Sequence, residues 1–157
     1  MGTVAVIGLG NVLMGDEGIG VHLVRHLAAR QLLPQGVEIV EAGSAGMRLL
    51  HLLVGRDWIV FVDGAYMGLA PGTLRQFRPE DVRSCKGLAG FSLHEGDLLS
   101  ILDVSRRLGE CPARIDIFGI EPGVVASGES LSATLSAQLD AYAQTIAAHM
   151  RGEGCPA

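Results

Sequence analysis

The sequence predicts an α/β fold in which helices cover both faces of a mostly parallel sheet. Two observations predict this fold. Apolar runs typical of buried strands, such as residues 4–9 and 58–62, alternate along the chain with segments whose apolar residues recur at helical spacing. The first of these runs leads into a glycine-rich turn with Gly8, Gly10 and Gly15, after which a helix is expected to begin.

Local signals place each element in order. The strands are expected at residues 4–9, 37–41, 58–62, 73–77 and 114–120. The helices are expected at residues 17–32, from the turn at 43–46 to residue 53, at 92–104 and at 132–150. Pro34 ends the first helix because proline has no N–H to donate, and Ser92 can cap the start of the third.

The stretch between the third strand and the third helix departs from the regular alternation. The link before residues 73–77 is too short for a helical crossover, so this strand is expected to run antiparallel. Residues 78–90 are polar and contain Pro79 and two glycines, which predicts a surface loop.

Composition limits the class of protein. With 157 residues, of which 48% are hydrophobic and 18% charged, the chain is expected to form one domain over residues 1–157. The net charge of −5 and the absence of a Lys/Arg cluster argue against nucleic acid as a partner. Three widely spaced cysteines without a C-x-x-C pair fit a reducing cytoplasm. No apolar run reaches the roughly 18 residues of a membrane span, and none resembles a signal peptide.

The glycine-rich turn lacks the residues of a phosphate-binding loop. Leu13 occupies the position of the third glycine in a dinucleotide fingerprint. Asp16 and Glu17 stand where a P-loop has Lys and Ser or Thr. Since two carboxylates repel phosphate and attract a cation, this turn predicts a cation site rather than a nucleotide site. Either carboxylate, Asp16 or Glu17, can instead stabilise the positive N-terminus of the helix that follows.

Carboxylates also follow the other predicted strands, at the edge where α/β sheets bind ligands. The candidates are Asp16, Glu17, Glu41, Asp63 and Glu121. His94 opens the helix before the last strand, so carboxylates and an imidazole can meet at one edge and bind a divalent cation such as nickel or zinc. Each residue also has an ordinary structural role: Asp63 can cap a turn, and His94 can bond to the backbone.

Other catalytic arrangements are disfavoured. Cys85 and His94 suggest a thiol nucleophile, but Cys85 lies in a polar segment without a sign of an activated thiolate. The sequence has no G-x-S-x-G elbow of a serine hydrolase. Four histidines lie in predicted helices without an evident acidic partner and are expected at the surface or in packing. They are His22, His26, His51 and His149.

Several segments together resemble the hydrogenase maturation endopeptidases, which trim the C-terminal tail of the large-subunit precursor of nickel–iron hydrogenases. The matching segments, in order, are Gly8-Leu9-Gly10-Asn11-Val12-Leu13, Asp16-Glu17-Gly18-Ile19-Gly20-Val21, Gly43-Ser44-Ala45-Gly46-Met47, Val62-Asp63, Pro71-Gly72-Thr73, Ser92-Leu93-His94 and Gly119-Ile120-Glu121-Pro122. Two positions depart from the family pattern. Gly64 stands where alanine is common, and Glu41 stands where an aspartate is often found.

The resemblance implies a three-layer α/β/α sandwich with a twisted, mostly parallel five-stranded sheet. It implies an aspartic-type endopeptidase that recognises nickel already installed in the precursor, with Glu17, Asp63 and His94 as both metal-contacting and catalytic residues. Nickel is then carried by the substrate, and no organic cofactor is expected. The expected partner is the hydrogenase large-subunit precursor, and the protein is expected to be a cytoplasmic monomer without nucleic-acid or membrane partners.

Two other functions stay open at this point. A maturation chaperone that senses nickel in its partner without cutting it would use the same site. A nucleotide-binding protein on the same sheet is the second alternative, against which the acidic turn and Leu13 count.

Overall fold

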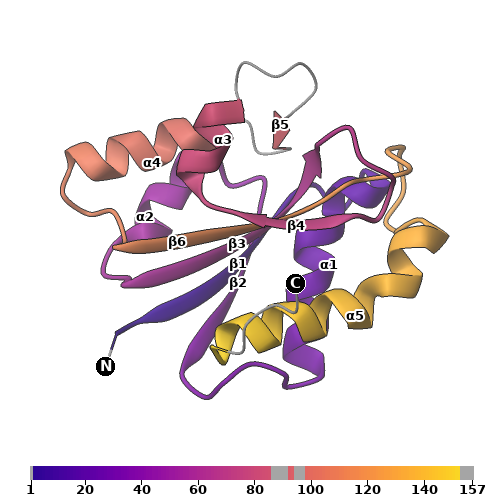
Figure 1. Ribbon diagram of the computed structural model, residues 1–157, viewed down its shortest axis with the longest axis horizontal. Helices are drawn as coiled ribbons and strands as arrows, with labels where there is room; N and C mark the ends of the chain where they lie inside the picture. Colours follow the sequence, from indigo (N-terminus) through magenta and orange to yellow (C-terminus); the bar gives the residue numbers. More distant parts are fainter. Residues whose placement is uncertain (1, 86–91, 94–97, 153–157) are drawn as a thin grey trace.

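A computed structural model of the protein describes residues 2–85, 92–93 and 98–152. A sheet lies between two layers of helices (Figure 1). The strands are β1 (Val4–Leu9), β2 (Val37–Gly43), β3 (Trp58–Tyr66), β4 (Leu74–Phe77), β5 (Ser92–Leu93) and β6 (Arg114–Ile120). The helices are η1 (Gly15–Gly18), α1 (Ile19–Ala29), η2 (Gly46–Arg48), α2 (Leu49–Leu53), α3 (Pro79–Cys85), α4 (Leu98–Arg107) and α5 (Ala133–Met150).

The sheet has the strand order β2-β1-β3-β6-β4, and the first four of these strands are parallel. β4 runs antiparallel to β6, as its short connection predicts. The two residues of β5 pair antiparallel with the end of β3. The predicted fold class, with five main strands, is confirmed. The carboxyl ends of the four parallel strands therefore share one edge of the sheet.

Two apolar cores lie on the two faces of the sheet. The helices α2, α3 and α4 cover one face of the sheet, and α1 and α5 cover the other (Figure 1). Side chains of the first three helices belong to one core, and those of α1 and α5 belong to the other. Ile117 and Phe118 are neighbours on β6 but belong to different cores, because successive side chains of a strand point to opposite faces. No helix in the described residues is long and apolar enough to cross a membrane.

The segment expected as a loop at residues 78–90 begins with the helix α3, so that prediction was wrong. Pro79 occupies the first helical position, where its missing N–H costs nothing. The Asp81 carboxylate accepts a hydrogen bond of 2.9 Å from the Arg78 N–H in front of the helix, and Val82 is buried. Residues 86–90 lie outside the described part of the chain.

Two further boundaries differ from expectation near the end of β3. This strand continues to Tyr66, so Asp63 lies within it and pairs with Gly119 of β6. Ser92 and Leu93 form β5 instead of opening a helix, and α4 begins at Leu98. In both cases the partner strand decides the conformation, and a partner distant in sequence leaves no local pattern.

Candidate functional site

Glu17 and Asp63, two of the three predicted site residues, both lie at the carboxyl edge of the sheet. Glu17 is on η1, directly after the turn that follows β1, and Asp63 is on the neighbouring strand β3. Asp63 is fully buried, whereas Glu17 is partly exposed. One carboxylate is therefore part of the sheet framework, and the other is accessible from outside.

Gly10 lies between these two residues. Its φ of +117° belongs to the region that favours glycine. A Cβ at this position would overlap the carbonyl oxygen of Glu17 and would lie 3.6 Å from Asp63 Oδ1. The turn can pass between Glu17 and Asp63 because residue 10 has no side chain.

Tyr66 joins this group, although no sequence pattern pointed to it. Its hydroxyl lies 3.5 Å from Glu17 Oε1, a long hydrogen bond. Burial raises the pKa of the Tyr66 phenol, and so do the charge and hydrogen bond of Glu17 and the charges of Glu121 and Asp63. The phenol therefore stays protonated at neutral pH and can donate a hydrogen bond. No local signal could have found Tyr66, because the continuation of β3 beyond Asp63 depends on pairing with strands that are distant in sequence.

Glu121, another predicted edge carboxylate, supports the loop that follows β3. Its side chain is buried, and Oε2 accepts a hydrogen bond of 2.6 Å from the Met67 N–H. Its backbone N–H donates to the Thr73 carbonyl at 2.9 Å, and its carbonyl accepts from the Gly72 N–H at 2.8 Å. Glu121 thus fixes the β3–β4 connection against the end of β6.

Asp16 supports the frame of the site. Although it lies in the first turn of η1, its fully buried carboxylate accepts backbone hydrogen bonds from Gly123, Val124 and Ser132 at 2.9, 2.8 and 2.7 Å. Burial raises the pKa of this carboxyl, but the three amide bonds and a hydrogen bond with the Ser132 side chain together outweigh burial and hold the pKa below its ordinary value. Asp16 therefore stays ionised and ties η1 to the loop before α5.

His94, the third predicted site residue, lies outside the described residues. Leu93, which precedes it, pairs with Ala65, two positions after Asp63. Within residues 2–85, 92–93 and 98–152, no group of three or more His, Cys, Asp or Glu side chains can hold a metal ion. Glu17 and Asp63 offer two carboxylate donors, which suit a divalent cation that receives its remaining ligands from other groups.

Comparison with known proteins assigns the chain. The sequence model of the hydrogenase maturation protease family, HycI, matches residues 21–149. The chain belongs to the hydrogenase maturation protease family.

Relatives and solved structures agree with this assignment. Hydrogenase 2 maturation protease of Escherichia coli is 33% identical over 155 residues, which are 98% of this chain and 94% of that protein. HupD of Rhodobacter capsulatus, a hydrogenase expression/formation protein, is 33% identical over 138 residues, 87% of this chain but 66% of HupD. The chain thus spans just under two thirds of that relative. The structure of the hydrogenase maturating endopeptidase HybD from E. coli has a TM-score of 0.81, with 32% identity over 96% of this chain and 93% of HybD.

In this hydrogenase maturation protease family member, Glu41 pairs with Arg25 of α1. Glu41 Oε2 lies 3.0 Å from Arg25 Nε, and both side chains are about half exposed. Glu41 belongs to β2, two strands away from Asp63 in the sheet, and it lines a cavity of about 400 Å³ together with Gly10. The structure therefore places Glu41 beside a cavity next to the glycine turn.

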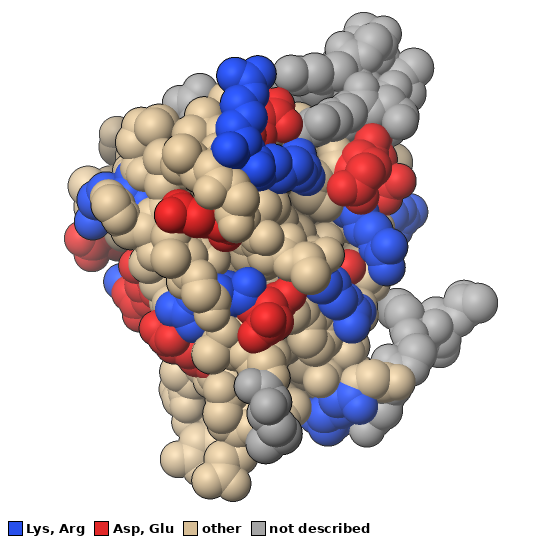
Figure 2. Space-filling view, turned by 90° about the vertical axis from the view of Figure 1, so that its left-hand side faces the viewer, with Lys and Arg blue, Asp and Glu red and all other residues tan. Residues whose placement is uncertain are grey.

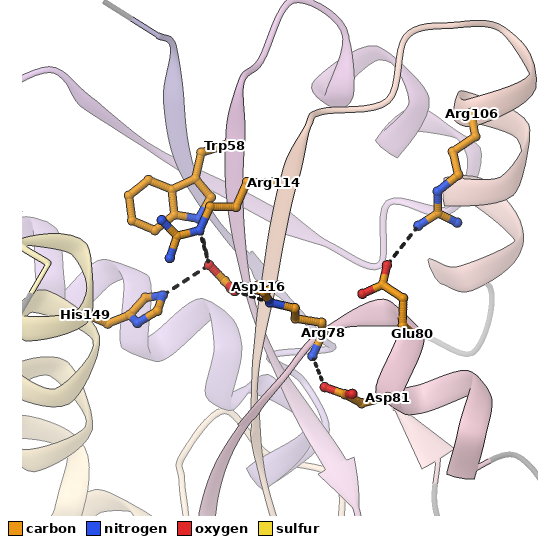
Figure 3. Close-up of polar contacts among 8 residues, drawn as sticks. All are labelled: Trp58, Arg78, Glu80, Asp81, Arg106, Arg114, Asp116 and His149. Atoms are coloured by element: carbon orange, nitrogen blue, oxygen red, sulfur yellow. Dashed lines mark hydrogen bonds and ion pairs between the residues drawn. The ribbon is translucent and has the colours of Figure 1, made fainter. Parts of the chain in front are cut away.

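Two helical histidines do have acidic partners, contrary to the sequence-based expectation. His26 Nε2 lies 3.2 Å from Asp140, and His149 Nε2 lies 3.1 Å from Asp116 (Figure 3). These partners are far away in sequence, so spacing along the chain cannot show them. Asp116 also accepts hydrogen bonds from Trp58 Nε1 at 2.9 Å and Arg114 Nε at 3.0 Å.

Asp116 and its partners hold α5 against the sheet. Burial raises the pKa of the Asp116 carboxyl, but the bonds from His149 and Trp58 and the nearby charges lower it more, so Asp116 stays ionised. The His149 ring also lies edge-on to Trp58 and Phe118, with centroids 5.8 and 5.3 Å apart. This cluster is structural and lies toward the amino end of β6.

A cavity of about 270 Å³ near this cluster is lined by Arg78, Arg106 and Arg114. Each guanidinium already faces a carboxylate: Arg78 and Arg114 face Asp116, and Arg106 faces Glu80 at 3.8 Å (Figure 3). Figure 2 shows basic and acidic side chains intermixed over this side of the molecule. The cavity is therefore largely charge-balanced.

Proposed function

We propose that the chain is an endopeptidase that removes the C-terminal extension from the nickel-loaded large-subunit precursor of a nickel–iron hydrogenase. The observation that carries this proposal is the position of Gly10, next to both the Glu17 backbone carbonyl and the Asp63 carboxylate, at the carboxyl edge of the sheet where ligands bind, in a chain of this family.

We assign Glu17, Asp63 and His94 to the recognition of the nickel ion that the precursor carries. Carboxylate and imidazole groups are suitable ligands for this ion. Because Glu17 is partly exposed, a docked partner can reach the site from outside the sheet edge. Three protein ligands leave further positions for groups of the substrate, so free nickel is expected to bind weakly.

Peptide hydrolysis requires a water oxygen to add to the scissile carbonyl carbon while a base takes its proton. The C–N bond then breaks, and the leaving amine takes up a proton. Glu17 is the more exposed of the two carboxylates and is our choice for the base, while the Tyr66 hydroxyl orients it from 3.5 Å. The nickel of the precursor, when bound here, supplies a Lewis acid that polarises the carbonyl.

The test is processing of purified precursor, with and without nickel, followed by the mass of the precursor. Glu17→Gln, Asp63→Asn and His94→Ala are each expected to slow cleavage of the nickel-loaded precursor by about 100-fold or more. Glu110→Gln, an exposed carboxylate between α4 and β6, is the matched control and keeps wild-type cleavage.

Near wild-type cleavage by all three variants would overturn the proposed site. A wild-type protein that binds the nickel-loaded precursor and leaves its mass unchanged would instead identify a nickel-sensing chaperone.

A further inference from the structure

β2 is an edge strand of the sheet with unused pairing capacity. Among the described residues, it pairs with β1 on one side and with no strand on the other. Of its seven residues only Ala42 is buried, whereas five of the six residues of β1 are. An edge strand presents the N–H and C=O groups of alternate residues outward, where another strand can pair with them.

Two cavities lie on opposite faces of β2 near its carboxyl end. The α1-side cavity, of about 400 Å³, is lined by Leu13 and Val21 and reaches Gly10. The α2-side cavity, of about 290 Å³, is lined by Ala45 and Leu52. Glu41 and Ala42 of β2 line both cavities, so the edge strand separates them.

This arrangement matches the geometry of an extended peptide. Successive side chains of a strand point to opposite faces, so a peptide added to the edge of β2 directs neighbouring side chains toward the two cavities. Each cavity also has charged residues in its lining, Arg25 and Glu41 in the α1-side cavity and Glu41 and Arg48 in the α2-side cavity. Its apolar part, Leu13 and Val21 in the first and Ala45 and Leu52 in the second, suits an apolar side chain. Backbone pairing then supplies affinity, and the two cavities supply selectivity.

We infer that β2 binds the C-terminal extension of the precursor as an added strand, with two successive apolar side chains entering the α1-side and α2-side cavities. This inference rests on the proposed function and names the part of the substrate that is held. The Arg48 side chain donates a long hydrogen bond of 3.4 Å to the Ala42 carbonyl, and the added strand would displace it.

The cavities lie close enough to the candidate site for the C-terminal extension of the precursor to reach them. The α1-side cavity reaches Gly10, the residue that separates Glu17 from Asp63. A strand outside β2 lies three strand spacings from β3, roughly 14 Å, which about four extended residues can cross. The candidate site lies at the carboxyl end of β2, so a substrate chain that continues from the scissile bond along β2 runs antiparallel to it. The part of the substrate on the C-terminal side of the scissile bond is the part that cleavage removes.

The charges on β2 argue against a second copy of this chain as the occupant. Glu38 and Glu41 both lie on this edge strand and pair with Arg56 and Arg25 of the same chain. Antiparallel pairing of two β2 strands would bring these carboxylates toward those of the other copy, which is unfavourable. The precursor segment is therefore the favoured partner.

Cavity-filling variants test the inference in the cleavage assay. Ser44 lines the α1-side cavity and His51 the α2-side cavity, and both are exposed, so tryptophan can replace them without entering the core. Ser44→Trp and His51→Trp are each expected to raise KM for the nickel-loaded precursor at least tenfold. Gln144→Trp, at an exposed position on α5, is the matched control and leaves KM unchanged.

Hydrogen exchange tests the backbone pairing itself. A synthetic peptide with the sequence of the C-terminal extension is added to the wild-type protein, and amide exchange is followed by mass spectrometry. Slower exchange is expected in β2, while β4, the opposite edge strand, serves as the internal control.

The outcomes separate the inference from the proposed function. If the wild-type protein cleaves the precursor, but both tryptophan variants keep its KM and β2 gains no protection, the inference is wrong and the proposed function stands. If the wild-type protein does not cleave the nickel-loaded precursor, the proposed function fails. Protection of β4 instead of β2 would also overturn the inference.

Discussion

At the scale of single residues, Gly10 allows the backbone of Glu17 to lie close to the turn after β1. Its positive φ and its contact with the Glu17 carbonyl both require the absence of a side chain. Gly36 offers a comparison, because it has a φ of +90° but no atom within 4 Å of the position of a Cβ. Substitution of Gly36 therefore measures the free-energy cost of backbone conformation alone, and substitution of Gly10 adds the cost of steric overlap.

We predict that Gly36→Ala lowers the free energy of unfolding by about 1–2 kcal/mol through backbone strain alone. Gly10→Ala carries the same strain plus an overlap with Glu17 that costs about 1–3 kcal/mol more. Urea denaturation of both variants measures the difference. Gly10→Ala should also slow precursor cleavage because it displaces Glu17, and equal effects of the two variants on stability and cleavage would contradict this account.

At the scale of elements, Asp16 joins η1 to the β6–α5 connection, which is more than 100 residues away in sequence. Its carboxylate binds amides of the loop after β6 and of Ser132, the N-cap residue of α5. Backbone bonds reinforce the same junction, since Gly15 N–H donates to the Gly128 carbonyl and Gly128 N–H donates to the Leu13 carbonyl, both at 2.9 Å. The segment between β1 and α1, which includes Glu17, is therefore fixed by hydrogen bonds to the β6–α5 connection.

This junction predicts a dependence of stability on pH. Folding lowers the pKa of the Asp16 carboxyl, so its contribution is present above the unfolded pKa of about 3.9 and is lost as pH falls through the folded value. Asp16→Asn is expected to lower the free energy of unfolding at pH 7 by about 2 kcal/mol. The difference between the two proteins should shrink as the pH falls below about 4.

Thermal denaturation between pH 7 and pH 3 measures this effect. Asp103→Asn, at a half-exposed position on α4, is the control and should change stability little at any pH. A constant difference between Asp16→Asn and wild type over this range would show that ionisation of Asp16 does not stabilise the fold.

At the scale of the whole molecule, the sheet lies between the two cores, and its strands contribute side chains to both. Ile117 and Phe118 on β6 are almost fully buried, in different cores. The indole N–H of Trp58, at the start of β3, donates to Asp116 of β6, so Trp58 fluorescence reports on the contact between these two neighbouring strands. Loosening either core should therefore destabilise the whole chain.

We predict that Ile117→Ala costs about 2–5 kcal/mol and Phe118→Ala about 3–5 kcal/mol of unfolding free energy. Because both residues belong to the same strand, each variant should unfold in a single transition. Trp58 fluorescence and far-UV circular dichroism should give the same midpoint. Two separate transitions in either variant would show that the cores unfold independently.

Local patterns were sufficient to predict most of the framework. β1 and β6 have the expected bounds, and the last helix, expected at residues 132–150, is α5 at Ala133–Met150. The extension of β3 to Tyr66 and the strand β5 were not predictable locally, because each depends on pairing with the other. The helix α3 was missed because Pro79 was taken as a loop residue, although proline suits the first turn of a helix.

The sequence by itself determined the α/β class, the family resemblance and the edge of the sheet where Glu17 and Asp63 lie. These features follow from hydrophobic periodicity and from residues close together in the chain. Only the tertiary structure decided which carboxylates support the frame. Asp16 and Glu121 bind backbone amides, those of Asp16 more than 100 residues away, and Tyr66 reaches Glu17 from another strand. Burial and hydrogen-bond partners arise from contacts between distant segments, and no local pattern encodes them.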